Sequence, residues 1–130
     1  MRDPGACCHH RLVKPRLLLV DDHAGFRSFA RALLEAEGYS VVGEAADGAS
    51  AIRGAERLAP EIVLLDVILP DLDGFEVCER ITGKGARPIA VVLTSSRDPA
   101  AYRDRLARSS ARGFIAKEDL TGAALAALTG

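Results

Sequence analysis

Residues 16–22 read RLLLVDD, a continuous apolar run that ends in two acidic residues. A run of this kind is typical of a strand that is buried on both faces, which occurs mainly in parallel sheets. Residues 61–66 (EIVLLD) repeat the pattern, and apolar runs of strand length also occupy residues 40–45, 89–94 and 112–116. These five runs predict the strands of one buried parallel sheet.

Between these runs, apolar residues recur at the spacing of amphipathic helices. The first helix is expected to end near Gly38, because glycine is typical of helix C-termini. Asp98 and Pro99 suit the N-cap and the first position of a helix over residues 98–109. The other helices are predicted to end before Pro60, to span residues 75–81 and to span residues 120–128. Because a helix follows each strand, we predict a doubly wound α/β fold with helices on both faces of the sheet.

The 130 residues suffice for one domain, and the 48% of apolar residues can fill a single core. Residues 1–15 are polar and lack periodicity, so we expect a disordered tail before a domain at residues 16–130. A net charge of −1 neither indicates nor excludes a nucleic-acid partner. No apolar run approaches the ~20 residues that cross a bilayer, and three cysteines do not make a disulfide framework. We therefore expect a cytoplasmic protein.

Three further patterns are open to more than one interpretation. Residues 7–10 read CCHH, but adjacent ligands lack the two-residue spacing of zinc sites, which favours a solvated tail. Cys78 lies on the apolar stripe of its predicted helix and is expected in the core. A basic stretch near the fourth helix is either a solvated face or a dimer or partner surface. Its members are Arg103, Arg105, Arg108 and Arg112.

Polar residues gather where the predicted strands end. Asp21 and Asp22 end the first strand, Asp66 ends the third, Thr94 ends the fourth, and Lys117 directly follows the fifth. Because ligand sites of doubly wound sheets lie at the carboxyl ends of the strands, we expect these side chains to converge. Each residue alone could be a helix cap or a solvated side chain, but their joint position at four strand ends favours a site.

Electrostatics limits what such a site can do. Three close carboxylates repel one another, and a cation relieves that repulsion. Hard oxygen ligands suit Mg²⁺ better than zinc. A divalent ion and a lysine beside one carboxylate would together receive a phosphoryl group, whose transfer depends mainly on positioning and charge neutralisation. The carboxylate would then become an acyl phosphate.

The chain resembles the receiver domains of two-component response regulators. Four segments carry the resemblance, which covers about residues 16–129: LLLVDDH (17–23), LLDVILPDLDGFE (64–76), VVLTSS (91–96) and GFIAK (113–117). The resemblance implies five βα units of the flavodoxin-like type with strand order 2-1-3-4-5. It also implies a signalling switch that modifies itself rather than an enzyme with turnover.

The resemblance assigns a role to each matching residue. Asp66 is expected to accept the phosphoryl group and, with Asp22, to bind Mg²⁺ directly. Asp21 is expected to act on the ion through water, and the backbone carbonyl of Ile68 to be a further ligand. Among the remaining residues, Thr94 corresponds to the switch hydroxyl, Lys117 to the phosphoryl clamp, and Phe114 to an aromatic side chain that turns inward on activation.

The same resemblance implies the partners. A sensor histidine kinase would supply the phosphoryl group. Two copies could pair through the fourth helix, fifth strand and last helix, or through the first and last helices. The domain itself is not expected to contact nucleic acid or membrane, but a DNA-binding effector could be attached in a longer chain or be separate, which would make the output transcriptional.

The chain departs from the usual receiver pattern at three positions. Glu118 follows Lys117 where many receivers have proline, and with His23 this resembles LuxR-type regulators, in which a receiver precedes a helix-turn-helix domain. Ser95 stands where a smaller residue is usual. The side chain of Ile68, two residues after the acceptor, is apolar, and we expect it to shield the acyl phosphate from water.

Two other functions stay open. Phosphatases of the haloacid dehalogenase type also use an aspartate nucleophile and Mg²⁺, but they need a second aspartate where this chain has Ile68. A receiver-like module that works by protein contact alone would not need Asp66, Thr94 and Lys117. A P-loop nucleotide site is excluded, because the chain contains no GxxxxGK[ST] motif.

Overall fold

A computed structural model of the chain describes residues 13–83 and 88–130. Most of the predicted N-terminal tail, including the CCHH stretch at residues 7–10, lies outside the described residues. Within them, the helices are all too short or too polar to cross a membrane.

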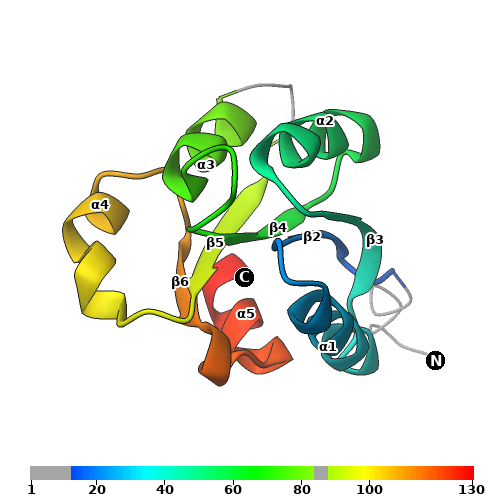
Figure 1. Cartoon of the computed structure of the whole chain (residues 1–130). Coiled ribbons are helices and arrows are strands. Elements are labelled where there is room, and N and C mark those ends of the chain that lie inside the picture. The colour runs from blue at the N-terminus through cyan, green and yellow to red at the C-terminus, as the bar shows by residue number, and fades with distance from the viewer. Residues whose placement is uncertain (1–12, 84–87) are drawn as a thin grey trace.

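Five parallel strands form one sheet in the order β3-β2-β4-β5-β6, which is 2-1-3-4-5 when the strands are counted along the chain (Figure 1). Every residue of β4 and β5 is buried, as the continuous apolar runs predicted. The doubly wound α/β fold and its strand order are therefore confirmed. The strands are β2 (Arg16–Val20), β3 (Ser40–Ala45), β4 (Ile62–Asp66), β5 (Ala90–Ser95) and β6 (Gly113–Ala116).

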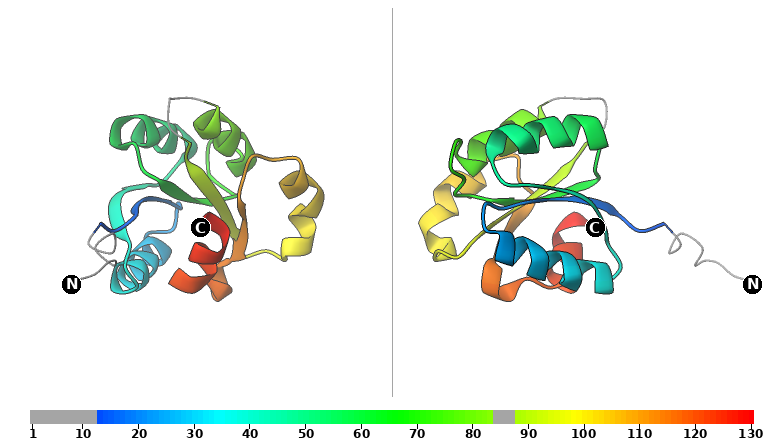
Figure 2. Two further views of the ribbon diagram at one scale, coloured as in Figure 1. Left: turned by 180° about the vertical axis from the view of Figure 1, so that it is seen from behind. Right: turned by 45° about the vertical axis from the view of Figure 1, so that its right-hand side comes forward.

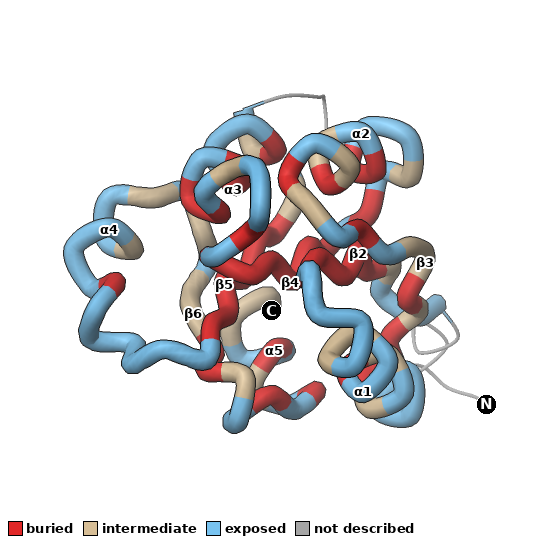
Figure 3. Tube along the Cα trace, in the orientation of Figure 1, coloured by how far each residue is buried: buried red, intermediate tan, exposed pale blue. Residues whose placement is uncertain are grey.

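Helices cover both faces of the sheet, which lies in the middle as a buried layer (Figures 2 and 3). On one face, α1 (Ala24–Ala36) and α5 (Gly122–Thr129) pack on an aliphatic cluster that includes Leu19, Leu64 and Val92. The other face is covered by α2 (Gly48–Leu58), α3 (Gly74–Thr82) and α4 (Arg103–Ala107). The cluster on that face contains Cys78, and burial raises the pKa of its thiol to about 12.

The fourth helical segment is shorter and less regular than the sequence predicts. In place of one helix over residues 98–109, a 3₁₀ helix (η2, Pro99–Tyr102) leads into a five-residue α4. The predicted cap is present, since the Asp98 carboxylate accepts a hydrogen bond from the Ala100 amide at 2.9 Å. Only Tyr102 and Leu106 anchor the segment in the core, and so little burial does not hold a longer helix.

The last helix also begins later than predicted. Lys117–Asp119 forms a 3₁₀ helix (η3), Leu120 is extended, and α5 starts at Gly122. Thr121 fixes this start, because its hydroxyl accepts a hydrogen bond from the Ala124 amide at 2.9 Å.

The loop after β4 is held by contacts to the starts of α2 and α3. The Asp71 carboxylate accepts hydrogen bonds from the Gly48 and Ala49 amides at 2.7 and 3.0 Å, which ties this loop to the start of α2. At Gly74 a Cβ atom would lie 2.5 Å from the carbonyl oxygen of Asp66. The start of α3 therefore approaches the end of β4 as closely as glycine allows.

The substitution Gly74→Ala is expected to lower the free energy of unfolding by about 1–3 kcal/mol, the usual cost of overpacking a close contact. Urea denaturation measures the change. Gly25→Ala is the matched control, because a Cβ at Gly25 meets no atom within 4 Å. An equal loss in both variants would contradict the close approach.

Candidate functional site

The strand register carries the predicted site residues to one edge of the sheet. Val20 pairs with Leu65, and Asp66 pairs with Thr94. Asp21 follows Val20, and Lys117 follows the last residue of β6. Residues that pair in register on neighbouring strands point to the same face of the sheet, and successive residues of one strand alternate between the faces. The side chains of Asp21, Asp66 and Thr94 therefore lie on the face that α1 and α5 cover.

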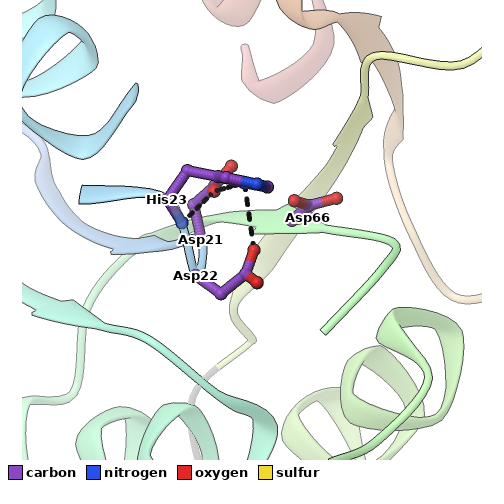
Figure 4. Close-up of side chains that lie close together, drawn as sticks. All are labelled: Asp21, Asp22, His23 and Asp66. Atoms are coloured by element: carbon purple, nitrogen blue, oxygen red, sulfur yellow. Dashed lines mark hydrogen bonds and ion pairs between the residues drawn. The ribbon is translucent and has the colours of Figure 1, made fainter. Parts of the chain in front are cut away.

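The carboxylates come together as the sequence predicts. Asp21 and Asp66 are buried, and Asp22 is exposed. One ligand atom from each of Asp21, Asp22, His23 and Asp66 lies within 4.8 Å of the others. Figure 4 shows these side chains converging from the end of β2 and the end of β4. The structure thus supplies an acidic cluster with one imidazole, open to solvent on the side of Asp22.

Lys117 bridges the two buried acids. Its Nζ lies 2.6 Å from Asp21 Oδ2 and 3.1 Å from Asp66 Oδ2, and the ammonium also sits 4.6 Å from the centre of the Phe26 ring. Burial alone would lower the pKa of Lys117, but the two carboxylates outweigh it and raise that pKa overall. The contact to Asp21 is an ion pair without good hydrogen-bond geometry, so Asp21 Oδ2 remains a buried oxygen that accepts no hydrogen bond.

Asp66 is held in a conflicting environment. Burial, followed by the charge of Asp21, raises the pKa of its carboxyl group, whereas the Ile68 amide and Lys117 favour the ionised form. The Ile68 amide donates to Asp66 Oδ1 at 3.0 Å, and the Ile68 side chain remains 46% exposed beside it. The net result is a carboxylate whose charge is incompletely compensated.

Thr94 and Phe114 lie on opposite faces of the sheet. Thr94 is buried, and within the described residues its hydroxyl has no hydrogen-bond partner. Phe114 pairs with Leu93 in register and packs against Tyr102, with ring centres 5.7 Å apart. Tyr102 in turn places its hydroxyl 3.5 Å from Ser95 Oγ, at the limit of a hydrogen bond. The structure therefore places Thr94 on the same face as the acids, next to Asp66 in register, whereas Phe114 packs against Tyr102 on the other face.

Two site residues were not predicted from the sequence. His23 donates from its backbone amide to Asp21 Oδ1 at 2.8 Å, and its Nδ1 lies 3.2 Å from Asp21 and 3.1 Å from Asp22. Arg27 donates to the backbone carbonyl of Asp21 at 2.6 Å. The available signal was position, because His23 directly follows the acid pair and Arg27 lies one helical turn beyond it.

The basic stretch is partly explained within the chain. Arg105 pairs with Asp73 at 2.7 Å and lies over the Phe75 ring, 4.3 Å from its centre. This contact fastens α4 to the start of α3, so Arg105 is not simply part of a solvated face.

The donor set fits a divalent cation. Three carboxylates meet in one cluster, and the buried Asp21 Oδ2 has no hydrogen bond to satisfy it. Carboxylate oxygens are the ligands that Mg²⁺ prefers. His23 adds a nitrogen donor, which transition metals also accept. The residues present can therefore hold a hard divalent ion at the carboxyl edge of the sheet.

The sequence model of the response regulator receiver domain matches residues 17–128. The chain belongs to this family. The resemblance expected from its motifs is thus confirmed, and the fold is the one that the family adopts.

Individual relatives agree with this assignment. A transcriptional regulator of Pseudomonas aeruginosa is 37% identical over 113 residues, which are 86% of this chain and 54% of that protein. Among solved structures, the signal receiver domain of NarL from Mycobacterium tuberculosis is 34% identical, with a TM-score of 0.76 and coverage of 90% of this chain and 98% of that one. A LuxR-family response regulator from Aurantimonas sp. SI85-9A1 is 31% identical, with a TM-score of 0.78 and coverage of 89% and 86%. The chain spans about half the length of the curated relatives it matches.

The substitution Asp66→Asn is expected to raise the melting temperature at pH 7 in EDTA. Because the pKa of Asp66 is raised in the fold, its ionised form destabilises the native state, and asparagine removes that charge. The advantage of Asp66→Asn should shrink as pH falls through the raised pKa and vanish below the ordinary pKa of about 4. Melting curves from pH 3 to pH 8 measure it.

Asp104→Asn is the control, since it removes one negative charge at an exposed position. A stabilisation of Asp66→Asn that does not vary with pH, or a loss of stability at pH 7, would contradict the electrostatic strain.

Proposed function

We propose that this receiver is a phosphorylation switch in which Asp66 accepts a phosphoryl group from a sensor histidine kinase. The observation that carries the proposal is the Lys117 ammonium, 3.1 Å from the Asp66 carboxylate within the acidic cluster. A carboxylate beside a fixed cation suits phosphoryl transfer, which needs mainly positioning and charge neutralisation.

In the transfer, an Asp66 carboxylate oxygen forms a bond to phosphorus while the bond between phosphorus and the donor's imidazole nitrogen breaks. The products are an aspartyl phosphate and a free imidazole, so the reaction needs no external oxidant or reductant. Lys117 neutralises charge on the phosphoryl oxygens, and the Ile68 amide orients the carboxylate before attack. Loss of the phosphoryl group to water follows on the same residues, without turnover of any other substrate.

Mg²⁺ is the cofactor we propose for this site. Asp22 and Asp66 would bind it directly, Asp21 would act through water, and the backbone carbonyl of Ile68 would complete the protein ligands. The Asp21 oxygen Oδ2, which is buried and accepts no hydrogen bond, supports this assignment. When bound, the ion supplies charge neutralisation for the phosphoryl oxygens.

We propose that Thr94 relays the phosphorylated state. Its buried hydroxyl lacks a partner, which leaves it ready to donate to a phosphoryl oxygen on the adjacent strand. Movement of β5 at Thr94 carries Ser95 with it, and Ser95 touches Tyr102 against Phe114. The signal would thereby reach the surface formed by α4, β6 and α5.

That surface is our proposed contact for a second copy or an effector. A groove of about 600 Å³ runs between η2, α4, β6 and α5, and the sequence of α5 (GAALAALT) carries no charge. The surface formed by α1 and α5 is the alternative for a dimer. Because the relatives are transcriptional regulators of about twice the length, we propose a cytoplasmic role in transcription through an attached or separate DNA-binding effector, without nucleic-acid contact by this domain.

Incubation with acetyl phosphate and Mg²⁺ is expected to add one phosphoryl group to the wild-type protein and none to Asp66→Ala. Intact-mass spectrometry measures the product, and EDTA should abolish it. Asp104→Asn, at an exposed position, is expected to react like the wild type.

An unmodified wild type, or equal labelling of Asp66→Ala, would refute the proposal. Sustained hydrolysis of a chromogenic phosphate ester would instead favour the phosphatase alternative.

The Ile68 side chain is expected to slow hydrolysis of the aspartyl phosphate, because an apolar group beside Asp66 keeps water away. Ile68→Asn should therefore lose the phosphoryl group several-fold faster than the wild type, and Ile68→Val should behave like the wild type. Decay of the phosphorylated mass after removal of acetyl phosphate gives the rates. Identical decay in all three proteins would exclude the shield.

A further inference from the structure

Arg27 of α1 reaches back to the peptide that joins the two adjacent acids. Its Nη1 donates to the backbone carbonyl of Asp21 at 2.6 Å, and this carbonyl belongs to the peptide bond between Asp21 and Asp22. On the other side of the same residue, the Asp21 amide donates to the Ala45 carbonyl at 3.0 Å. The backbone of Asp21 is thus fixed both at its amide and at its carbonyl.

The guanidinium group is itself held in place. Its Nε donates to Glu44 Oε1 at 3.0 Å, and the Arg27 side chain is only 20% exposed. The Arg27 amide also donates to the His23 carbonyl at 3.1 Å, which closes the first turn of α1. The planar guanidinium binds Glu44 through Nε and the Asp21 carbonyl through Nη1, and so fixes the distance between β3 and the segment Asp21–Asp22.

This contact differs in kind from that of Lys117. Lys117 lies against the carboxylate oxygens and competes with any other cation for them. Arg27 binds the peptide oxygen and leaves the carboxylates free, while it brings a positive charge toward mutually repelling acids. A group that orients ligands without occupying them is the usual form of support behind a metal site.

We propose that Arg27 is a positioning residue that presets Asp21 and Asp22 for a divalent cation. This inference rests on the proposed function, because it assumes that the acid pair binds Mg²⁺. Without Arg27, the Asp21–Asp22 peptide could rotate, and the ion would have to order it on binding.

Arg31 provides a matched control on the same helix. It also binds Glu44, with Nη1 2.6 Å from Oε2, and its Nη2 donates to the Val41 carbonyl at 3.2 Å. Its described contacts lie on β3 and α1, away from Asp21 and Asp22. If the arginines merely fasten α1 to β3, loss of either should have the same effect.

The experiment compares Arg27→Gln, Arg27→Lys and Arg31→Gln with the wild type by calorimetric titration of Mg²⁺ and by the rate of phosphorylation from acetyl phosphate. Arg27→Gln is expected to weaken Mg²⁺ binding by about tenfold or more, the usual effect of losing support behind a metal ligand. Its phosphorylation rate should recover at saturating Mg²⁺. Arg27→Lys, which retains a donor for the carbonyl, should recover part of the affinity, and Arg31→Gln should bind Mg²⁺ like the wild type.

Wild-type Mg²⁺ affinity in Arg27→Gln, or an equal loss in Arg31→Gln, would overturn the positioning role while the proposed function stands. A wild-type protein that neither binds Mg²⁺ nor takes up a phosphoryl group would overturn the proposed function, and this inference with it. Melting temperatures separate a loss of metal affinity from a loss of stability. Arg27→Gln and Arg31→Gln each lose one ion pair with Glu44 and should therefore be destabilised alike.

Discussion

The repulsion between Asp21 and Asp66, two buried carboxylates at the edge of a parallel sheet, is the constraint on which the site depends. Strands β2 and β4 pair without a register shift, so Asp21, which follows β2, lies beside Asp66 at the end of β4. The Lys117 ammonium reduces this repulsion, because it lies against both carboxylates. One positive charge between two negative ones leaves a net negative site, which would favour binding of a further cation.

The sheet also separates the acidic cluster from the aromatic residues of the proposed relay. Asp21, Asp66 and Thr94 lie on the face covered by α1 and α5, whereas Tyr102 and Phe114 pack on the opposite face. A single strand connects them, because Thr94 and Ser95 are consecutive residues of β5 that point to opposite sides. In the proposed relay, a change at Asp66 would reach the aromatic side chains through the peptide unit between Thr94 and Ser95.

The extent to which the sequence predicts the structure follows from how each feature is encoded. The strands are visible because a buried parallel strand needs an unbroken apolar run, and the acids at their ends are then brought together by geometry. The strand order came from the resemblance, since nothing in the runs encodes it. The fourth helix was predicted too long because Asp98 and Pro99 mark its start clearly, whereas its extent depends on how much of it Tyr102 and Leu106 can bury.

Residues that support the site were harder to foresee than the acids themselves. Arg27 and Arg31 both look like exposed positions of an amphipathic helix, and only the three-dimensional path of β3 places Glu44 between them. The contact of Arg27 with Asp21 is to a backbone atom, which has no signature in the sequence. Support of this kind costs the acids none of their capacity to bind a cation, because it occupies a peptide oxygen.

The arrangement of charges also has a consequence for the proposed switch. Before modification, Lys117 is shared between Asp21 and Asp66, and Asp21 Oδ2 depends on it as its only described partner. A phosphoryl group on Asp66 would add about two negative charges and draw the ammonium toward itself. The Asp21 carboxylate would then lose that cation, keep the His23 amide as a donor to Oδ1, and depend on the metal for further charge compensation. Phosphorylation of Asp66 would thus increase the affinity of Asp21 and Asp22 for a divalent ion. Lys117 would couple phosphorylation to metal binding.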